Sequence, residues 1–169
     1  MIAVVFALAA AFLQATAAPE KAKAPFSISG LVLTSPAGAA MPSARPDEQM
    51  KVVLPGPPMA LRTFPQNDEI ALFAEVYDNE GKSPHKVDIT ATVTADEGKV
   101  MFKADEVRDS SDLGGQRGGY GFTTKIPLKD LAPGSYVLRV DARSRLAQTP
   151  PASREVQFTV EPARPGLAR

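Results

Sequence analysis

Residues 128 to 142 run Leu128-Lys129-Asp130-Leu131-Ala132-Pro133-Gly134-Ser135-Tyr136-Val137-Leu138-Arg139-Val140-Asp141-Ala142. Pro133 fixes its φ near about −65°, and Gly134 is suited to a positive φ, so this pair predicts a turn. From Tyr136 onward, apolar residues occupy every second position. This period of two predicts a strand with one face in a core and the other in solvent.

A tyrosine that enters a strand directly after such a turn resembles the tyrosine corner of immunoglobulin-like sandwiches. In that motif the phenol hydrogen-bonds to the backbone a few residues upstream. We therefore predict structural roles for Pro133, Gly134 and Tyr136. These residues indicate an architecture and leave the ligand open.

Short alternating segments recur along the rest of the chain. They lie at residues 26–33, 70–76, 87–93, 99–103, 122–128 and 156–160, with a further short edge strand expected at 52–54 inside a Pro-rich loop. Gly30 shifts the phase of the first segment, as a bulge does. The pattern predicts an all-β fold, an immunoglobulin-like β-sandwich of seven to eight mostly antiparallel strands, with a barrel as the structural alternative.

The composition limits the classes of partner and site. The chain has 169 residues, with 19 basic and 19 acidic side chains and no net charge, so no overall field favours nucleic acid. It has no Cys, which removes disulfides and thiolate metal sites. Sixteen Pro and twelve Gly suit a loop-rich β protein, since helix interiors tolerate neither residue well. We expect no cofactor.

The N-terminal residues predict export. An apolar run from Met1 to Leu13 precedes Ala15-Thr16-Ala17, which has the small residues that a signal peptidase reads. We expect a signal peptide at 1–17, a linker at 18–25, the sandwich at 26–161 and a flexible tail at 162–169. The protein is then secreted or periplasmic, with no membrane span after cleavage. No Lys or Arg precedes the run, so a retained membrane anchor and a start assigned too late stay as alternatives.

No catalytic signature is present in the sequence. His85 is the single histidine and lies in a predicted loop beside Pro84, where we expect it to be solvated. Asp105, Asp109 and Asp112 fall in a predicted polar, glycine-rich loop at 105–119. Oxygen-rich loops of this kind hold calcium in some proteins, so these are weak calcium candidates, but we favour a solvated loop as their explanation.

A possible binding patch comes from four residues near the start of the sandwich, Arg62, Phe64, Phe73 and Tyr77. Phe73 and Tyr77 alternate against the inward-facing set of their strand. The four side chains either form an exposed aromatic and cationic surface or pack beneath the Pro-rich loop. We favour the second arrangement, because loops commonly cover small apolar clusters.

Several of these segments together resemble the C-terminal β-sandwich region of bacterial von Willebrand factor A-related proteins. The residues concerned are Phe26-Ser27-Ile28-Ser29-Gly30-Leu31-Val32-Leu33, Arg62-Thr63-Phe64, Glu69, Ala74-Glu75-Val76-Tyr77-Asp78-Asn79 and Leu131-Ala132-Pro133-Gly134-Ser135-Tyr136. The resemblance covers roughly residues 26–160. In that family the adhesive metal site lies in a preceding α/β domain and uses Asp-x-Ser-x-Ser, which Asp109-Ser110-Ser111-Asp112 does not match. The resemblance implies an exported, non-catalytic accessory domain.

The sequence therefore favours an exported, non-catalytic β-sandwich module for protein binding or structural support in the cell envelope. Its expected partner is another envelope or extracellular protein. One alternative is a calcium-dependent adhesin or hydrolase that uses the acidic residues 105–112. Another is a C-terminal fragment of a longer von Willebrand factor A-related protein.

Overall fold

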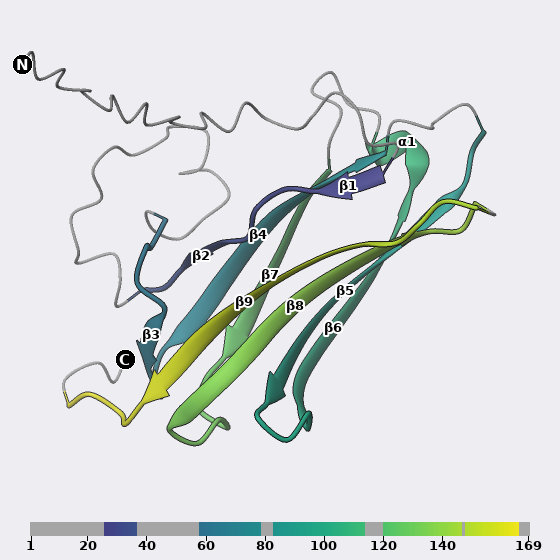
Figure 1. Ribbon diagram of the computed structural model, residues 1–169. Helices are drawn as coiled ribbons and strands as arrows, with labels where there is room; N and C mark the ends of the chain where they lie inside the picture. The colour runs from purple at the N-terminus through teal and green to yellow at the C-terminus, as the bar shows by residue number, and fades with distance from the viewer. Residues whose placement is uncertain (1–25, 37–57, 79–82, 114–119, 147, 166–169) are drawn as a thin grey trace, which may run out of the picture.

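The computed structural model describes residues 26–36, 58–78, 83–113, 120–146 and 148–165 (Figure 1). These residues form nine strands and one short helix. The elements are β1 (Phe26–Ile28), β2 (Val32–Thr34), β3 (Thr63–Pro65), β4 (Glu69–Asp78), β5 (Lys86–Ala95), β6 (Val100–Asp109), α1 (Ser110–Leu113), β7 (Tyr120–Pro127), β8 (Gly134–Ser144) and β9 (Ala152–Glu161). Within the described ranges, no helix is long and apolar enough to cross a membrane.

Two sheets face each other, and we call them the β4 sheet and the β8 sheet. In the β4 sheet, β4 pairs with β7 on one side and with β1 and β2 on the other. The β8 sheet has the order β3-β9-β8-β5-β6. All pairings are antiparallel except that of β3 with β9. The predicted immunoglobulin-like β-sandwich with mostly antiparallel strands is confirmed.

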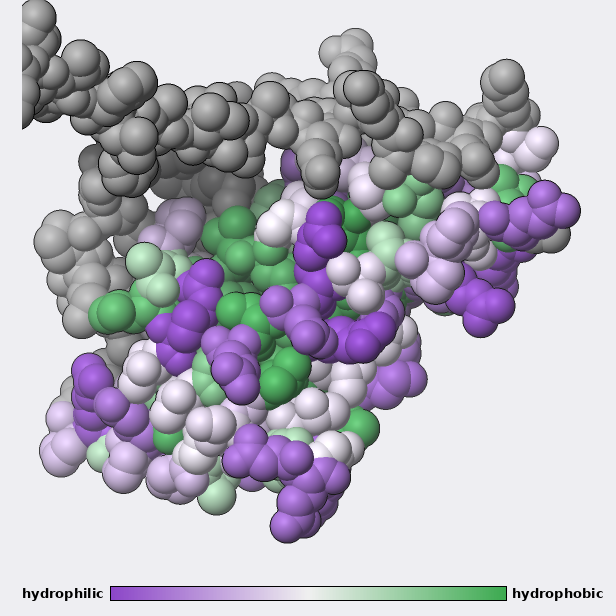
Figure 2. All heavy atoms as spheres, viewed as in Figure 1, coloured by the Kyte–Doolittle hydropathy of each residue, from purple (hydrophilic) through white to green (hydrophobic). Residues whose placement is uncertain are grey.

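The core lies between the sheets and follows the predicted alternation. Along β5, every second residue from Val87 to Val93 is buried, and β8 shows the same pattern from Tyr136 to Ala142. Aromatic rings fill the end near β3, where Phe158 stacks on Tyr136 with ring centres 5.6 Å apart. The space-filling view shows hydrophobic residues at the centre of one face, bordered by hydrophilic side chains (Figure 2).

The tyrosine corner forms as predicted. The Tyr136 hydroxyl donates to the backbone oxygen of Ala132 at 2.7 Å, and the N–H of Leu131 donates to the oxygen of Leu128 within the preceding turn. The expected positive φ at Gly134 is wrong, because Gly98 is the one described glycine with positive φ, at 74°. Gly134 instead begins β8 in an ordinary backbone conformation.

Gly30 marks a real shift in the first predicted strand. Ile28 lies opposite Val76, and Val32 lies opposite Phe73. The first segment therefore advances four residues while β4 advances three, which shifts the register by one residue across residues 29–31. The chain bridges this shift through Ser29, whose N–H donates to the Glu75 oxygen. The segment therefore forms two short strands on the same side of β4, which raises the strand count above the predicted seven to eight.

The predicted loop at 105–119 is wrong over its first half. β6 continues to Asp109 and is followed directly by α1. The polar composition of β6 did not indicate a strand, because in the described part of the chain β6 is the last strand of its sheet and has only one strand neighbour. Strand β3 has three residues and was not predicted. The expected signal peptide, linker and short strand at 52–54 lie outside the described residues.

Candidate functional site

Polar side chains concentrate at the end of the sandwich that carries α1. β4 and β6 end there, and β5 and β7 begin there (Figure 1). The site is defined by Glu106, Arg108 and Tyr120, which we call the edge cluster. A buried pair, Asp78 and His85, lies at the same end of β4 and β5.

The edge cluster bridges the last strands of the two sheets. Glu106 and Arg108 lie opposite Ile89 and Val87 in the register with β5, so they share the core-facing side of the sheet with these buried residues. Tyr120 is on β7 and has the same strand parity as buried Phe122. Three polar side chains thus occupy positions between β6 and β7 where apolar residues would ordinarily complete the core.

The three side chains hold one another in place. The Tyr120 hydroxyl donates to Glu106 Oε1 at 2.8 Å, and Arg108 forms an ion pair with Glu106. The Arg108 guanidinium also lies over the Tyr120 ring, 4.6 Å from its centre, which is a cation–π geometry. The Arg108 side chain is 38% exposed and that of Glu106 is 23% exposed. The cluster is therefore half-buried, ordered by its own contacts, and open to solvent on one side.

Electrostatics in the cluster favour neutral Tyr120 and charged Arg108. Burial, followed by the hydrogen bond to Glu106, raises the pKa of Tyr120 to about 12. Burial acts to lower the pKa of Arg108, but the hydrogen bond and charge of Glu106, with Tyr120 and Asp112, raise it above its ordinary value. The Nε of Arg108 is buried and has no hydrogen-bond partner among the described residues. Within the described part of the chain, this donor is therefore unused.

His85 is buried, so the prediction of a solvated loop histidine is wrong. Its Nε2 lies 2.5 Å from Oδ2 of Asp78, and the two side chains are only 4% and 2% exposed. Its Nδ1 lies 2.8 Å from the backbone oxygen of Ser83. Both ring nitrogens therefore face protein acceptors. The pair ties the end of β4 to the start of β5.

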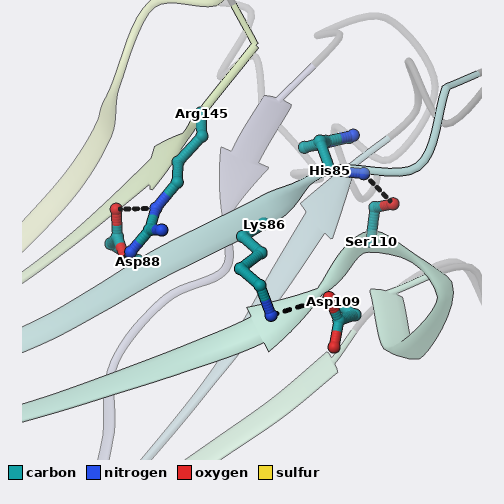
Figure 3. Close-up of polar contacts among 6 residues, drawn as sticks. All are labelled: His85, Lys86, Asp88, Asp109, Ser110 and Arg145. Atoms are coloured by element: carbon teal, nitrogen blue, oxygen red, sulfur yellow. Dashed lines mark hydrogen bonds and ion pairs between the residues drawn. The ribbon is translucent and has the colours of Figure 1, made fainter.

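The backbone around His85 is also tied to α1. Its N–H donates to the Ser110 hydroxyl at 3.1 Å, and the Ser110 N–H donates to the His85 oxygen at 2.8 Å (Figure 3). Figure 3 also shows two nearby ion pairs, Lys86 with Asp109 at 3.1 Å and Arg145 with Asp88 at 2.6 Å. The α1 end of the sandwich is thus cross-linked by one buried and several exposed polar contacts.

The weak calcium candidates do not form a common site. Asp105 and Asp109 lie on β6, not on a loop, and Asp112 lies in α1. Asp105 accepts from Lys103 at 2.8 Å and from Thr90 at 2.7 Å, and its pKa is lowered by these contacts. Within the described ranges, no group of three or more His, Cys, Asp or Glu is arranged to hold a metal ion.

The four candidates for a binding patch lie on different sheets. Phe64 is on β3 and is fully buried, with its ring centre 6.2 Å from that of Phe158. Phe73 and Tyr77 are on β4, on the face away from Phe64, and Tyr77 is buried and donates to Glu75. Burial, followed by the bond to Glu75, raises the pKa of Tyr77. Arg62 donates to the Met59 oxygen. A single exposed patch is therefore wrong, and the Pro-rich loop at 37–57 lies outside the described residues.

The edge cluster was not predicted from the sequence. Glu106 and Arg108 continue the period-two alternation of Phe102 and Ala104, which was a usable signal for the strand. Tyr120 is far from Glu106 and Arg108 in the sequence, so no local pattern indicates that it contacts them. The packing of the β4 sheet against the β8 sheet, with β7 in one and β6 in the other, brings these residues together.

Comparison with known proteins supports the architecture. The chain matches no protein-family model and no curated protein. The solved structure of the C-terminal domain of Wzt is similar over 84% of this chain and 77% of that chain, with 14% identity and a TM-score of 0.50. At this identity the likeness shows the fold alone: both are β-sandwich domains.

Longer glycosidases also contain a similar region. Bacteroides uniformis β-glucuronidase 2 aligns with 80% of this chain at 11% identity and a TM-score of 0.48, and a glycosyl hydrolase family 2 member from Bacteroides cellulosilyticus aligns with 80% at 10% identity and a TM-score of 0.45. The chain spans only 14% of the length of each of these enzymes.

Proposed function

We propose that this chain is an exported, non-catalytic β-sandwich module that binds another protein of the cell envelope through the edge cluster. The observation that carries the proposal is the Arg108 side chain, which is 38% exposed and is held in place by its ion pair with Glu106 and its position over the Tyr120 ring. The exposed part of this guanidinium is a charged donor, so a partner's carbonyl or carboxylate oxygen gains affinity by accepting a charge-assisted hydrogen bond from it. Tyr120 and Glu106 fix the guanidinium plane in advance, which lowers the ordering cost of binding.

The non-catalytic part of the proposal rests on how the polar groups are used. The imidazole of His85 has acceptors at both nitrogens, and the carboxylates of Asp105 and Glu106 are held by cations and hydroxyls. A general base needs a lone pair directed at the substrate's proton. We therefore expect purified protein to be inactive against peptide, ester and glycan substrates, and turnover at enzyme-like rates would contradict this.

Export is supported by the apolar N-terminal run and the small residues Ala15 and Ala17. The likeness of the sequence to accessory sandwiches of von Willebrand factor A-related proteins is consistent with an envelope role. Mass spectrometry of the protein recovered from the native envelope fraction tests this. We expect a mature N-terminus at Ala18, and a secreted or periplasmic protein that begins at Met1 would overturn cleavage.

Binding is tested with immobilised full chain and a solubilised envelope fraction, followed by affinity measurement on the captured partner. Arg108→Ala should weaken binding by about tenfold or more, because it removes a charge-assisted donor. Arg139→Ala is the matched control, since Arg139 is an exposed β8 arginine paired with Asp141. Equal effects of the two substitutions, or no effect of Arg108→Ala, would show that the edge cluster is not part of the binding interface.

A further inference from the structure

β6 is the last strand of the β8 sheet, and its outer edge has no strand partner among the described residues (Figure 1). It is ten residues long, which is long for an open edge. Two of the large hydrophobic side chains that are exposed in the described ranges lie on it, Val100 at 55% and Val107 at 50%. Such an edge presents unpaired backbone donors and acceptors to any strand of matching pattern.

The register with β5 identifies which residues present these groups. Backbone N–H and C=O groups of successive residues point to opposite edges of a strand. Ser110 donates to His85 across the β5–β6 ladder, so residues an even number of positions from Ser110 face β5. The groups of Lys103, Asp105 and Val107 therefore face the open edge.

We propose that two copies of this chain associate through antiparallel pairing of β6 with β6, with Ala104 of each copy at the two-fold axis. This register places Lys103 of each copy opposite Asp105 of the other. Val107 then lies opposite the end of β6 in the second copy, where Val100 and Met101 form the bulge that β6 makes against Thr94. Opposite charges near the axis and apolar side chains at both ends make the edge complementary to itself.

Neighbouring registers lack this complementarity. A shift of two residues in one direction sets Lys103 against Lys103, and the same shift in the other direction sets Asp105 against Asp105. In a register shifted by one residue, the backbone groups that face the open edge of one copy lie opposite residues of the other copy whose backbone groups already bond to β5. The existing contact of Lys103 with Asp105 in one chain, at 2.8 Å, becomes part of a four-charge arrangement of alternating sign.

The pairing joins the two β8 sheets into one continuous sheet. The second copy supplies hydrogen-bond partners for the backbone groups at the open edge of β6, which solvent would otherwise contact. On the core-facing side, Glu106 of one copy lies opposite Phe102 of the other in this register, so the two edge clusters lie on either side of the axis. Capture from the envelope fraction measures partner binding by the edge cluster, and sedimentation measures self-association, so either proposal can fail without the other.

The test is sedimentation equilibrium of the full chain across a range of concentrations. We expect a concentration-dependent monomer–dimer equilibrium for the natural sequence. Asp105→Lys or Lys103→Asp alone should raise the dimer dissociation constant by about tenfold or more, because each places like charges opposite one another twice. The double exchange Lys103→Asp with Asp105→Lys should restore it to within about threefold.

The double exchange keeps the experiment decisive even where a single variant folds poorly. Exchanging Arg139 and Asp141 on β8, away from the edge, is the control and should leave the dissociation constant unchanged. A chain that stays monomeric at millimolar concentration, or a double exchange that fails to restore association while thermal unfolding is unchanged, would overturn the proposal.

Discussion

The hydroxyl of Tyr136 donates to the backbone oxygen of Ala132 at 2.7 Å, and so ties the beginning of β8 to the turn before it. The ring stacks on Phe158, which places the same side chain in the core. Its polar atom therefore fixes the path of the turn, while its ring contributes to packing.

Replacing Tyr136 by Phe should cost about 1 kcal/mol in the free energy of unfolding, because one buried hydrogen bond is lost and the ring is kept. Urea unfolding measures this change. Binding and self-association should be unaffected. A loss of binding at unchanged stability would show that Tyr136 acts at an interface.

The Asp78–His85 pair should contribute far more to stability than the exposed pair beside it. His85→Ala removes the contact of the imidazole with the buried Asp78 carboxylate, and we expect a loss of roughly 3 kcal/mol. Lys86→Ala removes an exposed pair with Asp109 and should cost about 0.5 kcal/mol or less. Thermal or urea unfolding of the two variants checks the contrast, and similar losses would contradict it.

Tyr120 should ionise only at high pH. Its pKa of about 12 lies above the ordinary value of 10.0, so the native state holds this proton more tightly than the unfolded chain does. The resulting stabilisation is fully present below about pH 10 and is lost as the pH rises towards about 12. An absorbance titration of tyrosinate should show the Tyr120 step moving to lower pH in Glu106→Gln. Tyr120→Phe identifies that step by its absence.

Glycine substitutions should separate two turn positions. Gly98 has a φ of 74°, and Gly98→Ala should destabilise the protein by about 1 kcal/mol. Gly134 has no such conformation, and a Cβ there would meet only the Ala132 oxygen at 3.9 Å. Gly134→Ala should therefore be neutral or stabilise by a few tenths of a kcal/mol, about the effect of a less flexible unfolded chain. Unfolding midpoints in urea test both.

The central strands could be predicted because their alternation is complete. β5 and β8 have neighbours on both sides and apolar residues at the inward positions from Val87 to Val93 and from Tyr136 to Ala142, so period and burial agree there. β6 could not be placed fully, because Glu106 and Arg108 occupy inward positions at an open end of the sandwich. The contact of Asp78 with His85 joins the ends of two strands and has no periodic signature. The Pro and Gly residues around Gly134 correctly predicted a turn, but the positive φ predicted for Gly134 was wrong.

The two sheets differ in how their strands depend on one another. In the described residues, β1, β2 and β7 each pair only with β4. In the β8 sheet, by contrast, each strand pairs with the next one in the order β3-β9-β8-β5-β6. Loss of β1 or β2 therefore breaks a three-residue ladder and leaves the other pairings of β4 in place. Amide hydrogen exchange should follow this hierarchy, with the amides of the N-terminal strands exchanging through small local openings. Those β4 amides that bond to β7 should exchange only when the whole domain unfolds.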